Sequence, residues 1–330
     1  MMSLNQTNWT EATQAVEAAQ SIIIVTHVSP DGDAIGSALG LYNMLRQQDK
    51  QVTVAVDEGL PDFLAFLPNA TDIQPSLTSG TWDLMISTDS SDEPRTGKCG
   101  AYARAHSATI INLDHHATNT GFGDIYLVNP EAVSAAEVVF DWWGEAGYAL
   151  TREVAMPLLT GLVTDTLGFR TSNVKPRTLE IAHDLMALGA SLTEVTARAL
   201  ESRPYQVVTV WKQSLPSVML VNGVISANIT IADQVGVEDP DRMEYGLVGW
   251  LREVNEAMIA VVFTEEKPDE IKLSLRSKRG YDVSQVALAL GGGGHKQASG
   301  ATVKGTLQEV RERVLPLLYE AVKQGELEIV

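Results

Sequence analysis

Apolar and polar positions in the first half of the chain alternate as they do in strands followed by helices. Residues 22–25 form a short apolar run, typical of a buried parallel strand, and a polar segment follows them. Ile35, Leu39 and Tyr42 then recur at helical spacing. Asp33 is well placed as the N-cap of that helix. The pattern therefore predicts a strand, a polar loop and a helix in succession.

The same alternation continues to about residue 200. Further apolar runs predict three strands, at residues 51–56, 84–88 and 109–113. Helical periodicity predicts four helices, at residues 134–145, 153–164, 176–188 and 193–200. Strands that alternate with helices in this way indicate an α/β domain with a mostly parallel sheet flanked by helices.

A different pattern begins after residue 200. Residues 201–217 contain Pro204 and Pro216 around a modest helical stretch, which is typical of a linker. Five strands are predicted after it, at residues 218–220, 224–231, 257–263, 271–275 and 298–303. Two helices are predicted at residues 283–290 and 307–323. We therefore expect two domains, residues 1–200 and a smaller α/β domain at residues 218–330, joined by the linker.

Composition narrows the class of protein. The 330 residues are 45% hydrophobic and 20% charged, which suits a globular chain with a core. The longest apolar runs, such as residues 21–25 and 258–263, are far shorter than the roughly 20 residues that span a bilayer. No Lys or Arg precedes Arg46, so the start lacks the basic region of a signal peptide. Cys99 is the one cysteine, which excludes an intrachain disulfide. The expected location is the cytoplasm.

The net charge bears on the partners. The chain has 24 basic and 42 acidic residues, a formal charge of −18. Such a chain repels long polyanions, whose binding needs many Lys and Arg contacts, so we expect no long nucleic acid as a partner. A small anionic substrate remains compatible, because bound metal ions and a local basic patch can supply positive charge.

Metal-ligating side chains follow the ends of four apolar runs. These side chains are His27, Asp31 and Asp33 after the first run, Asp89, then Asp114, His115 and His116, and finally Asp165. The carboxyl ends of parallel strands share one edge of a sheet, so these loops can meet there. Clustered carboxylates repel one another, and divalent cations relieve that repulsion. Imidazole and carboxylate ligands without thiolates suit Mn²⁺ or Mg²⁺, with Zn²⁺, Fe²⁺ and Co²⁺ chemically possible.

Each of these pieces also has a structural interpretation. Asp33 alone is typical of an N-cap, and residues 30–33 alone are typical of a turn. His106 and His183 lie in helix-like polar contexts, and we assign them structural roles. The recurrence of all four segments favours a metal site.

The motifs carry a resemblance to a known family. Four segments resemble the four motifs of the DHH phosphoesterase family. They are HVSPDGDAIGS, which begins at His27, the single residue Asp89, DHHATN, which begins at Asp114, and TDT, which begins at Thr164. GGGGHKQASG at residues 291–300 resembles the signature of the C-terminal domain associated with that family. The resemblance covers nearly the whole chain and is strongest to members that degrade short oligonucleotides and also hydrolyse 3′-phosphoadenosine 5′-phosphate (pAp). Leu167 stands where many relatives have glycine.

The resemblance implies a two-metal site in the first domain, with Mn²⁺ as the expected ion and Mg²⁺ or Co²⁺ as alternatives. It implies that His27, Asp31 and Asp89 hold the first metal. It implies that Asp33, Asp89, His115 and Asp165 hold the second, with Asp89 as the bridge. His116 would contact the substrate phosphate or the bridging water, and Asp114 would orient a histidine.

The C-terminal domain is expected to bind the substrate. Residues 291–294 do not form a P-loop, because no Gly-Lys-Ser/Thr follows at the required spacing. Small residues do allow backbone N–H groups to approach a phosphate. The resemblance places an arginine and the histidine of this signature on the substrate. The predicted binding residues are Arg276, Gly293, Gly294, His295 and Lys296.

The predicted function is therefore a two-metal hydrolase of short substrates, with its active site in a cleft between the domains. The expected substrates are oligoribonucleotides of two to five nucleotides, cleaved to nucleoside 5′-monophosphates, and pAp, cleaved to AMP. One alternative is a phosphodiesterase of linear or cyclic dinucleotides, such as pApA or cyclic di-AMP. An alternative of another class is a non-catalytic nucleotide sensor, which would have eroded metal ligands. The resemblance also allows a homodimer.

Overall fold

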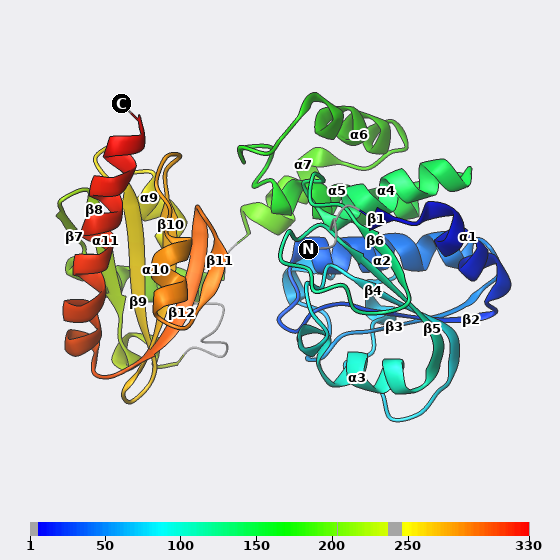
Figure 1. The fold of residues 1–330 in the computed structure, drawn as a ribbon, viewed down its shortest axis with the longest axis horizontal. Coiled ribbons are helices and arrows are strands. Elements are labelled where there is room, and N and C mark those ends of the chain that lie inside the picture. Colours follow the sequence, from blue (N-terminus) through cyan, green and yellow to red (C-terminus); the bar gives the residue numbers. More distant parts are fainter. Residues whose placement is uncertain (1–5, 203, 237–245, 330) are drawn as a thin grey trace. The chain divides into compact units, whose positions relative to one another are not determined.

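The computed structural model describes residues 6–202, 204–236 and 246–329, without the side chains of residues 6, 7, 295 and 326–329. The chain divides into two compact units, Met1–Ser202 and Arg203–Val330 (Figure 1). Each unit is built around a sheet and a hydrophobic core of its own. The two-domain α/β class expected from the sequence is confirmed.

The first unit contains a sheet of six described strands. They are β1 (Gln6–Thr7), β2 (Ser21–Val25), β3 (Gln51–Ala55), β4 (Trp82–Thr88), β5 (Ser107–Asp114) and β6 (Ile125–Val128). Their order across the sheet is β1-β6-β5-β4-β2-β3, and all pairs are parallel except the edge pair of β1 and β6. The chain runs outward in one direction from β2 and in the other from β4. The carboxyl ends of these two neighbours therefore form the crevice in which α/β proteins bind ligands.

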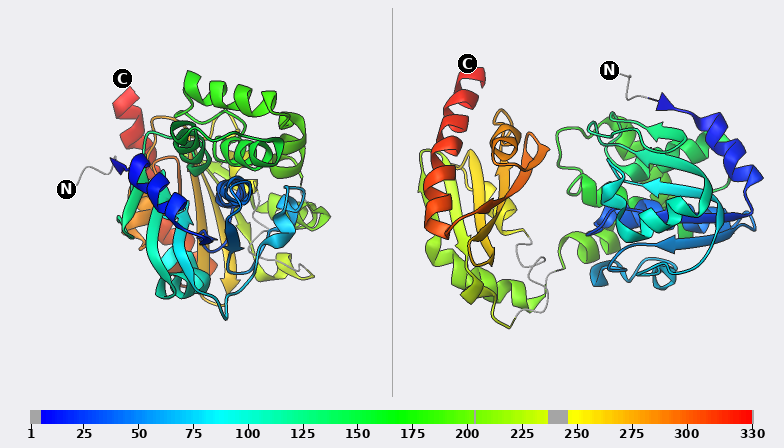
Figure 2. Two further views of the ribbon diagram at one scale, coloured as in Figure 1. Left: turned by 90° about the vertical axis from the view of Figure 1, so that its right-hand side faces the viewer. Right: turned by 60° about the horizontal axis from the view of Figure 1, so that its bottom comes forward.

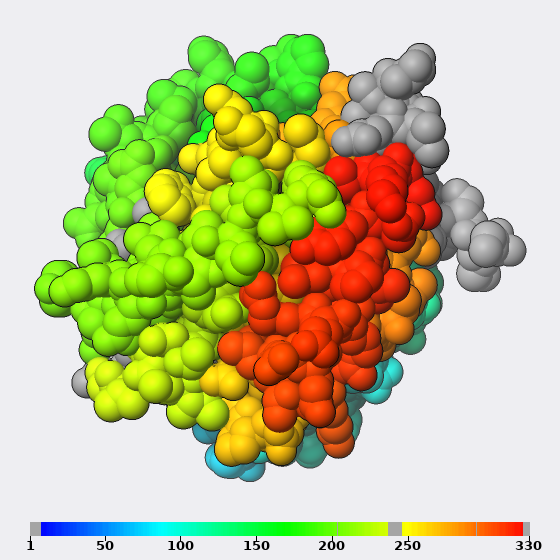
Figure 3. Space-filling model, turned by 90° about the vertical axis from the view of Figure 1, so that its left-hand side faces the viewer, coloured from blue at the N-terminus to red at the C-terminus, as the bar shows by residue number. Residues whose placement is uncertain are grey.

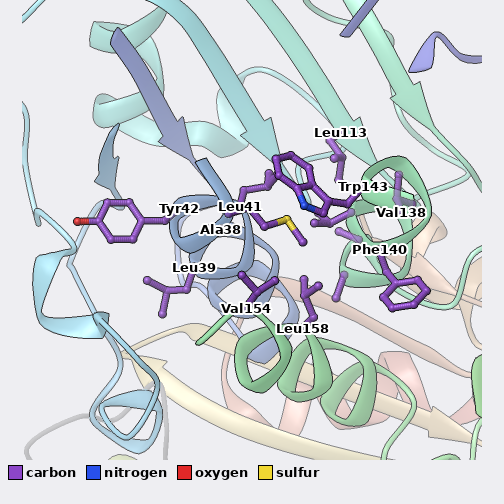
Figure 4. Close-up of a cluster of buried hydrophobic side chains, with 14 of the residues drawn as sticks. Ala38, Leu39, Leu41, Tyr42, Leu113, Val138, Phe140, Trp143, Val154 and Leu158 are labelled. Atoms are coloured by element: carbon purple, nitrogen blue, oxygen red, sulfur yellow. The ribbon is translucent and has the colours of Figure 1, made fainter. Parts of the chain in front are cut away.

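Helices cover both faces of this sheet (Figures 1 and 2). They are α1 (Trp9–Ala18), α2 (Gly32–Arg46), α3 (Gly97–Ala105), α4 (Ala135–Ala146), α5 (Arg152–Asp165), α6 (Pro176–Ala187) and α7 (Leu192–Val195), which continues as a π-helix at Thr196–Leu200. Cys99 and Ala103 of α3 pack with Ile23 and Met85 on one face. The larger core on the other face combines α2, α4 and α5 (Figure 4).

Helix α2 is buried from Gly32 to Leu45, which explains why it is apolar around its whole circumference. It packs tightly against α5, and two glycines allow the approach. A Cβ on Gly36 would lie 2.5 Å from the carbonyl oxygen of Pro157, and one on Gly161 would lie 2.5 Å from Asp33 Oδ1. The second contact matters for the site, because a larger residue at 161 would push Asp33 away.

The start of α2 differs from the prediction. The N-cap is Asp31, not Asp33: its Oδ1 accepts hydrogen bonds from the backbone N–H groups of Asp33 and Ala34, each at 3.0 Å. Asp33 lies inside the first turn and is buried. An aspartate two residues before the predicted cap satisfies the free N–H groups equally well, so spacing alone did not distinguish the two.

The second unit contains a sheet of six described strands in the order β11-β12-β10-β9-β8-β7. The strands are β7 (Met219–Val221), β8 (Val224–Ile229), β9 (Ile259–Lys267), β10 (Glu270–Ser277), β11 (Gly293–His295) and β12 (Ala298–Lys304). Neighbours are antiparallel except β8 and β9. The described helices are α8 (Tyr205–Ser214), α9 (Leu247–Arg252), α10 (Ser284–Ala289) and α11 (Leu307–Ile329).

Helices α10 and α11 pack on one face of this sheet (Figure 2), and α11 presents its outer side in red in Figure 3. Helices α8 and α9 pack on β8 and β9 on the opposite face. Along β10, Leu273 and Leu275 point to the α11 side and are buried. Lys272, Ser274 and Arg276 alternate with them on the other face and are half-buried.

Several described elements were not predicted. Helix α1 buries only Ala12 and Val16, and α3 buries only Cys99, Gly100 and Ala103, so neither shows a strong apolar stripe. The segment expected as a linker contains α8, whose Val207 and Val210 belong to the core of the second unit. In the described part of the chain, no helix combines the length and the apolar character needed to cross a membrane.

Candidate metal centre

Three adjacent strands of the first sheet deliver side chains to one edge. His27 follows β2, Asp89 follows β4, and Asp114 is the last residue of β5. Because β4 lies between β2 and β5, Asp89 lies in the middle of the group. Asp89 adopts a left-handed backbone conformation with φ of 53°, which is uncommon for a residue other than glycine and is found at functional sites.

Three groups of side chains have ligand atoms within 4.8 Å of one another. His27, Asp31 and Asp89 form the first group, and the third joins Asp114 and His116 to Asp89 and His115. His27 Nε2 lies 3.5 Å from Asp89 Oδ2 and 3.9 Å from Asp31 Oδ1. The ring is oriented by a 2.8 Å hydrogen bond between His27 Nδ1 and the carbonyl of Val28. That contact assigns the proton to Nδ1 and turns Nε2 toward the two carboxylates.

The second group consists of Asp33, His115 and Asp165. His115 Nε2 lies 3.8 Å from Asp33 Oδ2 and 3.7 Å from Asp165 Oδ2. It also lies 3.5 Å from Asp89 Oδ1, so Asp89 is adjacent to both groups. The structure thus brings together all six side chains that the resemblance assigns to the two metals.

The position of Asp165 corrects one part of the prediction. Asp165 is the last residue of helix α5, whereas the sequence pattern placed all four segments at strand ends. The apolar run before it, which includes Leu162 and Val163, is a buried helical turn. The helix predicted at residues 153–164 already ends beside Asp165, so only the grouping of Asp165 with the strand ends was wrong.

Asp33 is anchored by the start of another helix. Its Oδ2 accepts a hydrogen bond from the N–H of Ala135 at 2.6 Å, and its Oδ1 accepts one from Ala136 at 3.0 Å. These are unsatisfied donors of the first turn of α4, where the helix dipole favours a negative charge. Backbone groups a hundred residues away thereby fix this carboxylate, which sequence analysis did not foresee.

The histidines of the cluster are made basic by the carboxylates around them. Burial works to lower the pKa of His27, but Asp89 and Asp31 raise it to about 9. Burial likewise opposes the charged form of His115, but Asp89 and Asp165 raise its pKa well above the usual value. In the metal-free protein, the negative charge of these carboxylates therefore stabilises the protonated form of both imidazole rings.

The pKa values of the carboxyl groups in the cluster are shifted in opposite directions. Burial acts to raise the pKa of Asp89, but hydrogen bonds and charges from His115 and His27 hold it far below its usual value. Burial and the charges of Asp89 and Asp165 raise the pKa of Asp33 well above normal. The pKa of Asp165 is raised to about 6. Burial is the main cause and the charge of Asp89 adds to it, whereas the charge of His115 works to lower the pKa. This is the repulsion that divalent cations relieve.

The donor set fits divalent cations. Asp89 Oδ1 is buried and has only long contacts among the described residues, with His115 Nε2 at 3.5 Å and His116 Nδ1 at 3.6 Å, and no hydrogen bond of good geometry. A buried carboxylate oxygen without such a bond is costly, and a metal ion would satisfy it. The six side chains supply four carboxylates and two imidazoles without a thiolate, which suits Mn²⁺ or Mg²⁺ better than softer ions.

A hydrogen-bonded chain of side chains lies beside the two groups. Asp114 is fully buried, and its Oδ1 lies 2.8 Å from Nδ1 of His116. Its Oδ2 accepts a 2.6 Å hydrogen bond from Nδ2 of Asn119, which also donates to the carbonyl of Ser90 at 3.2 Å. Asp114 therefore orients His116 and is itself held by Asn119. Sequence analysis quoted Asn119 within its motif but gave it no role.

The other two histidines considered in the first unit lie in ordinary surroundings. His106 caps the end of α3, stacks on Tyr102 with ring centroids 4.0 Å apart, and bonds through Nδ1 to the Tyr102 carbonyl. His183 is 80% exposed beside Asp184. Neither belongs to a group of potential metal ligands in the described part of the chain.

The residues predicted to bind substrate lie in the second unit. Arg276 and Gly293 line a cavity of about 460 Å³. Lys296 is exposed and lies outside the described lining of that cavity. Lys278, from the same basic cluster as Arg276, instead donates to the carbonyls of Val254 and Asn255, so part of this cluster has a structural role.

Part of the glycine run forms a regular strand. Gly293 and Gly294 belong to β11 and pair with Gly300 and Ser299 of β12, so this part is a strand and not an open loop. A Cβ on Gly294 would lie 2.5 Å from the carbonyl oxygen of Ala298, which explains the need for glycine. The side chain of His295 lies outside the described residues.

Two family models match the chain. The model of the DHH family N-terminal domain matches residues 21–162, and that of the DHHA1 domain matches residues 245–324. The first match includes all the candidate metal ligands except Asp165. The second includes β10, β11 and β12.

Relatives extend the likeness over nearly the whole chain. The bifunctional oligoribonuclease and PAP phosphatase NrnA of Thermus thermophilus is 36% identical over 96% of this chain and 94% of its own length. The protein of the same name from Bacillus subtilis is 27% identical over 89% of this chain and 93% of its own. An exopolyphosphatase-related protein from Bacteroides fragilis superposes with a TM-score of 0.87 at 28% identity, covering 96% of this chain and 97% of that one. The chain belongs to the DHH family, and the resemblance inferred from its motifs is confirmed.

Proposed function

We propose that this protein is a two-metal phosphoesterase that hydrolyses short oligoribonucleotides to nucleoside 5′-monophosphates and also converts pAp to AMP. The observation that carries the proposal is the convergence of six His and Asp side chains around Asp89. The names of two similar proteins, the bifunctional oligoribonucleases and PAP phosphatases of Thermus thermophilus and Bacillus subtilis, support the choice of substrates.

The residues that would hold the metals follow from the two groups. His27, Asp31 and Asp89 would hold one cation; Asp33, His115 and Asp165, with Asp89 shared, would hold the other. Mn²⁺ is the ion we propose, since the mixed imidazole and carboxylate set suits it. Two such cations supply Lewis acidity, which lowers the pKa of water and stabilises charge on the attacking and leaving oxygens.

The chain's own groups then position the substrate. Asp114 fixes His116 through Nδ1, so Nε2 is the nitrogen with which His116 would contact a phosphate oxygen. Gly161 has no side chain and so leaves space for the carboxylate of Asp33, which accepts a hydrogen bond from the first turn of α4. This contact keeps the second group of ligands in place. In the second unit, Arg276 would hold a further phosphate by charge-assisted hydrogen bonds.

The test is a hydrolysis panel with purified protein and added Mn²⁺. The panel contains pAp, pApA, cyclic di-AMP, a pentanucleotide, a 24-mer and pyrophosphate. We expect release of 5′-monophosphates from the linear oligonucleotides, faster for two to five nucleotides than for the 24-mer, and AMP from pAp. A chelator should abolish both activities. Exclusive cleavage of cyclic di-AMP or pyrophosphate would reject the proposal, and binding without cleavage of any compound would indicate a nucleotide sensor.

A further inference from the structure

The cavity of the second unit extends well beyond Arg276. It lies on the face of the sheet opposite α10 and α11, and its volume of about 460 Å³ is that of a small-ligand site. Strand β10 contributes Lys272, Ser274 and Arg276, which point to this face at alternate positions. Their partners on β12 are Thr302, Gly300 and Ala298 in the same order. The cavity therefore has a cation at each end and small residues between them.

The two cations are separated by a defined length of strand. Lys272 and Arg276 are four residues apart on β10, so their Cα atoms are separated by about 13 Å along the strand. Successive phosphates of one strand are about 3.4 Å apart along the axis of a stacked duplex, and roughly twice that when the strand is stretched and unstacked. Two internucleotide steps of a stretched strand therefore match the separation of Lys272 and Arg276.

The floor between the cations leaves room for a ligand. Ser274, Gly300 and Ala298 have small side chains or none, so a sugar or base could lie over the strands without displacing a side chain. A floor without large side chains accommodates any of the four bases, as a ribonuclease of short fragments requires.

Lys272 already has one partner. Its Nζ lies 3.5 Å from Oε1 of Glu266, which belongs to the neighbouring strand β9 and is outside the described lining of the cavity. The pair is partly exposed, with the Lys272 side chain 36% accessible, so it is a weak ion pair. A phosphate could replace or share this partner, because its anionic oxygens accept charge-assisted hydrogen bonds from an ammonium group as a carboxylate does.

We propose that Lys272 is a length-determining residue: together with Arg276 it forms two anion subsites for phosphates that are two nucleotides apart. The inference rests on the proposed function and specifies it. A substrate with three phosphates in a row engages both subsites, whereas a dinucleotide or pAp reaches only one. A preference for a trinucleotide over a dinucleotide would then arise on this face of the second unit.

The test compares pApA with pApApA in the wild-type protein and in Lys272→Gln. We expect kcat/KM for pApApA to fall about fivefold to tenfold more than kcat/KM for pApA, through KM. Glu266→Gln should act in the opposite direction and raise the affinity for pApApA about twofold, because it removes the competing carboxylate. Lys267→Gln is the matched control: Lys267 pairs with Glu270 at 3.4 Å on the same hairpin but lies outside the described lining.

A binding measurement separates this inference from the proposed function. Fluorescence anisotropy of labelled pApA and pApApA, with Ca²⁺ in place of Mn²⁺, gives affinities whether or not the protein hydrolyses them. Absence of hydrolysis by the wild type rejects the proposed function alone. The inference is overturned if Lys272→Gln lowers kcat/KM and affinity equally for pApA and pApApA, or lowers them for neither.

Discussion

The two units differ sharply in charge. Residues 1–202 contain 10 basic and 25 acidic side chains, a formal charge of −15, whereas residues 203–330 contain 14 and 17, a charge of −3. The groups of potential metal ligands lie in the acidic unit, whose negative charge attracts cations. The nearly neutral unit carries the cavity flanked by Arg276 and Lys272, where an anion meets little repulsion. The net charge of the whole chain conceals this division.

The two sites also differ in how they are built. Asp33, Asp89 and Asp114 are buried and held by backbone or side-chain partners before any ligand arrives. The cavity of the second unit is an open surface formed by strands, with its cations at the edges. Rigid placement suits chemistry, which is sensitive to small displacements, and an open surface suits recognition of substrates that vary in base and length. Mutations should therefore affect turnover in one unit and affinity in the other.

The largest effect is expected at Asp89. Asp89→Asn should lower kcat/KM by roughly a thousandfold, because it removes charge from the one carboxylate adjacent to both groups of ligands. Metal content, measured by mass spectrometry of the dialysed protein, should fall as well. Asp92→Asn is the control, since the Asp92 carboxylate only accepts a hydrogen bond from the N–H of Arg95. Turnover near that of the wild type at saturating Mn²⁺ would exclude a shared role for Asp89.

Asn119 should have the next largest effect. Asn119→Ala removes the hydrogen bond that holds Asp114, which in turn orients His116. We expect kcat to fall about tenfold to a hundredfold, with little change in KM or in metal content. Asn129→Ala is a matched control, because the Asn129 side chain only accepts from the N–H of Glu131 in a loop. Loss of bound metal in Asn119→Ala would instead show that this residue supports the ligand groups themselves.

The two units also differ in how much of each could be predicted from the sequence. In the first unit, most of the site could be predicted. Strand ends could be located from runs such as residues 22–25, and the shared edge of a parallel sheet then brings His27, Asp89 and Asp114 together. The anchoring of Asp33 by α4 was beyond prediction, because it joins residues 102 and 103 positions apart. Asp165 was grouped with the strand ends although the periodicity predicted a helix at residues 153–164 directly before it, and the structure confirms that helix.

The second unit was harder to predict for a related reason. Glycine-rich sequence indicates a turn when it is considered locally, yet Gly293 and Gly294 form a strand because β12 supplies pairing partners. The basic residues near 276 looked equivalent in sequence. Their positions separate only in the fold. Arg276 lines the cavity and donates to the carbonyl of Leu275 at 2.9 Å, whereas Lys278 lies outside the described lining and donates to the carbonyls of Val254 and Asn255. Which cation faces a ligand is decided by strand alternation and tertiary contacts.

A smaller effect, on affinity alone, is expected at Arg276. Arg276→Ala should raise KM for phosphorylated oligonucleotides about tenfold and leave kcat and metal content unchanged. Arg313→Ala is a matched control, because Arg313 is also an arginine of the second unit that donates to a backbone carbonyl, that of Lys304. A fall in kcat without a change in KM would contradict the division of labour between the units.

The smallest expected effect is that of salt. Because the net charge is −15 on the first unit and −3 on the second, we expect each phosphate beyond the first few to meet a neutral or acidic surface. The logarithm of kcat/KM should fall with the logarithm of salt concentration at a slope set by about one to three phosphate contacts, each contributing roughly 0.7 for a single strand. The slope should also stop growing beyond a tri- or tetranucleotide. Measurements from dinucleotide to 24-mer at several salt concentrations check both points. A slope that steepens steadily with length would reveal an extended track for nucleic acid, and the contrast in charge would then not govern which substrates are bound.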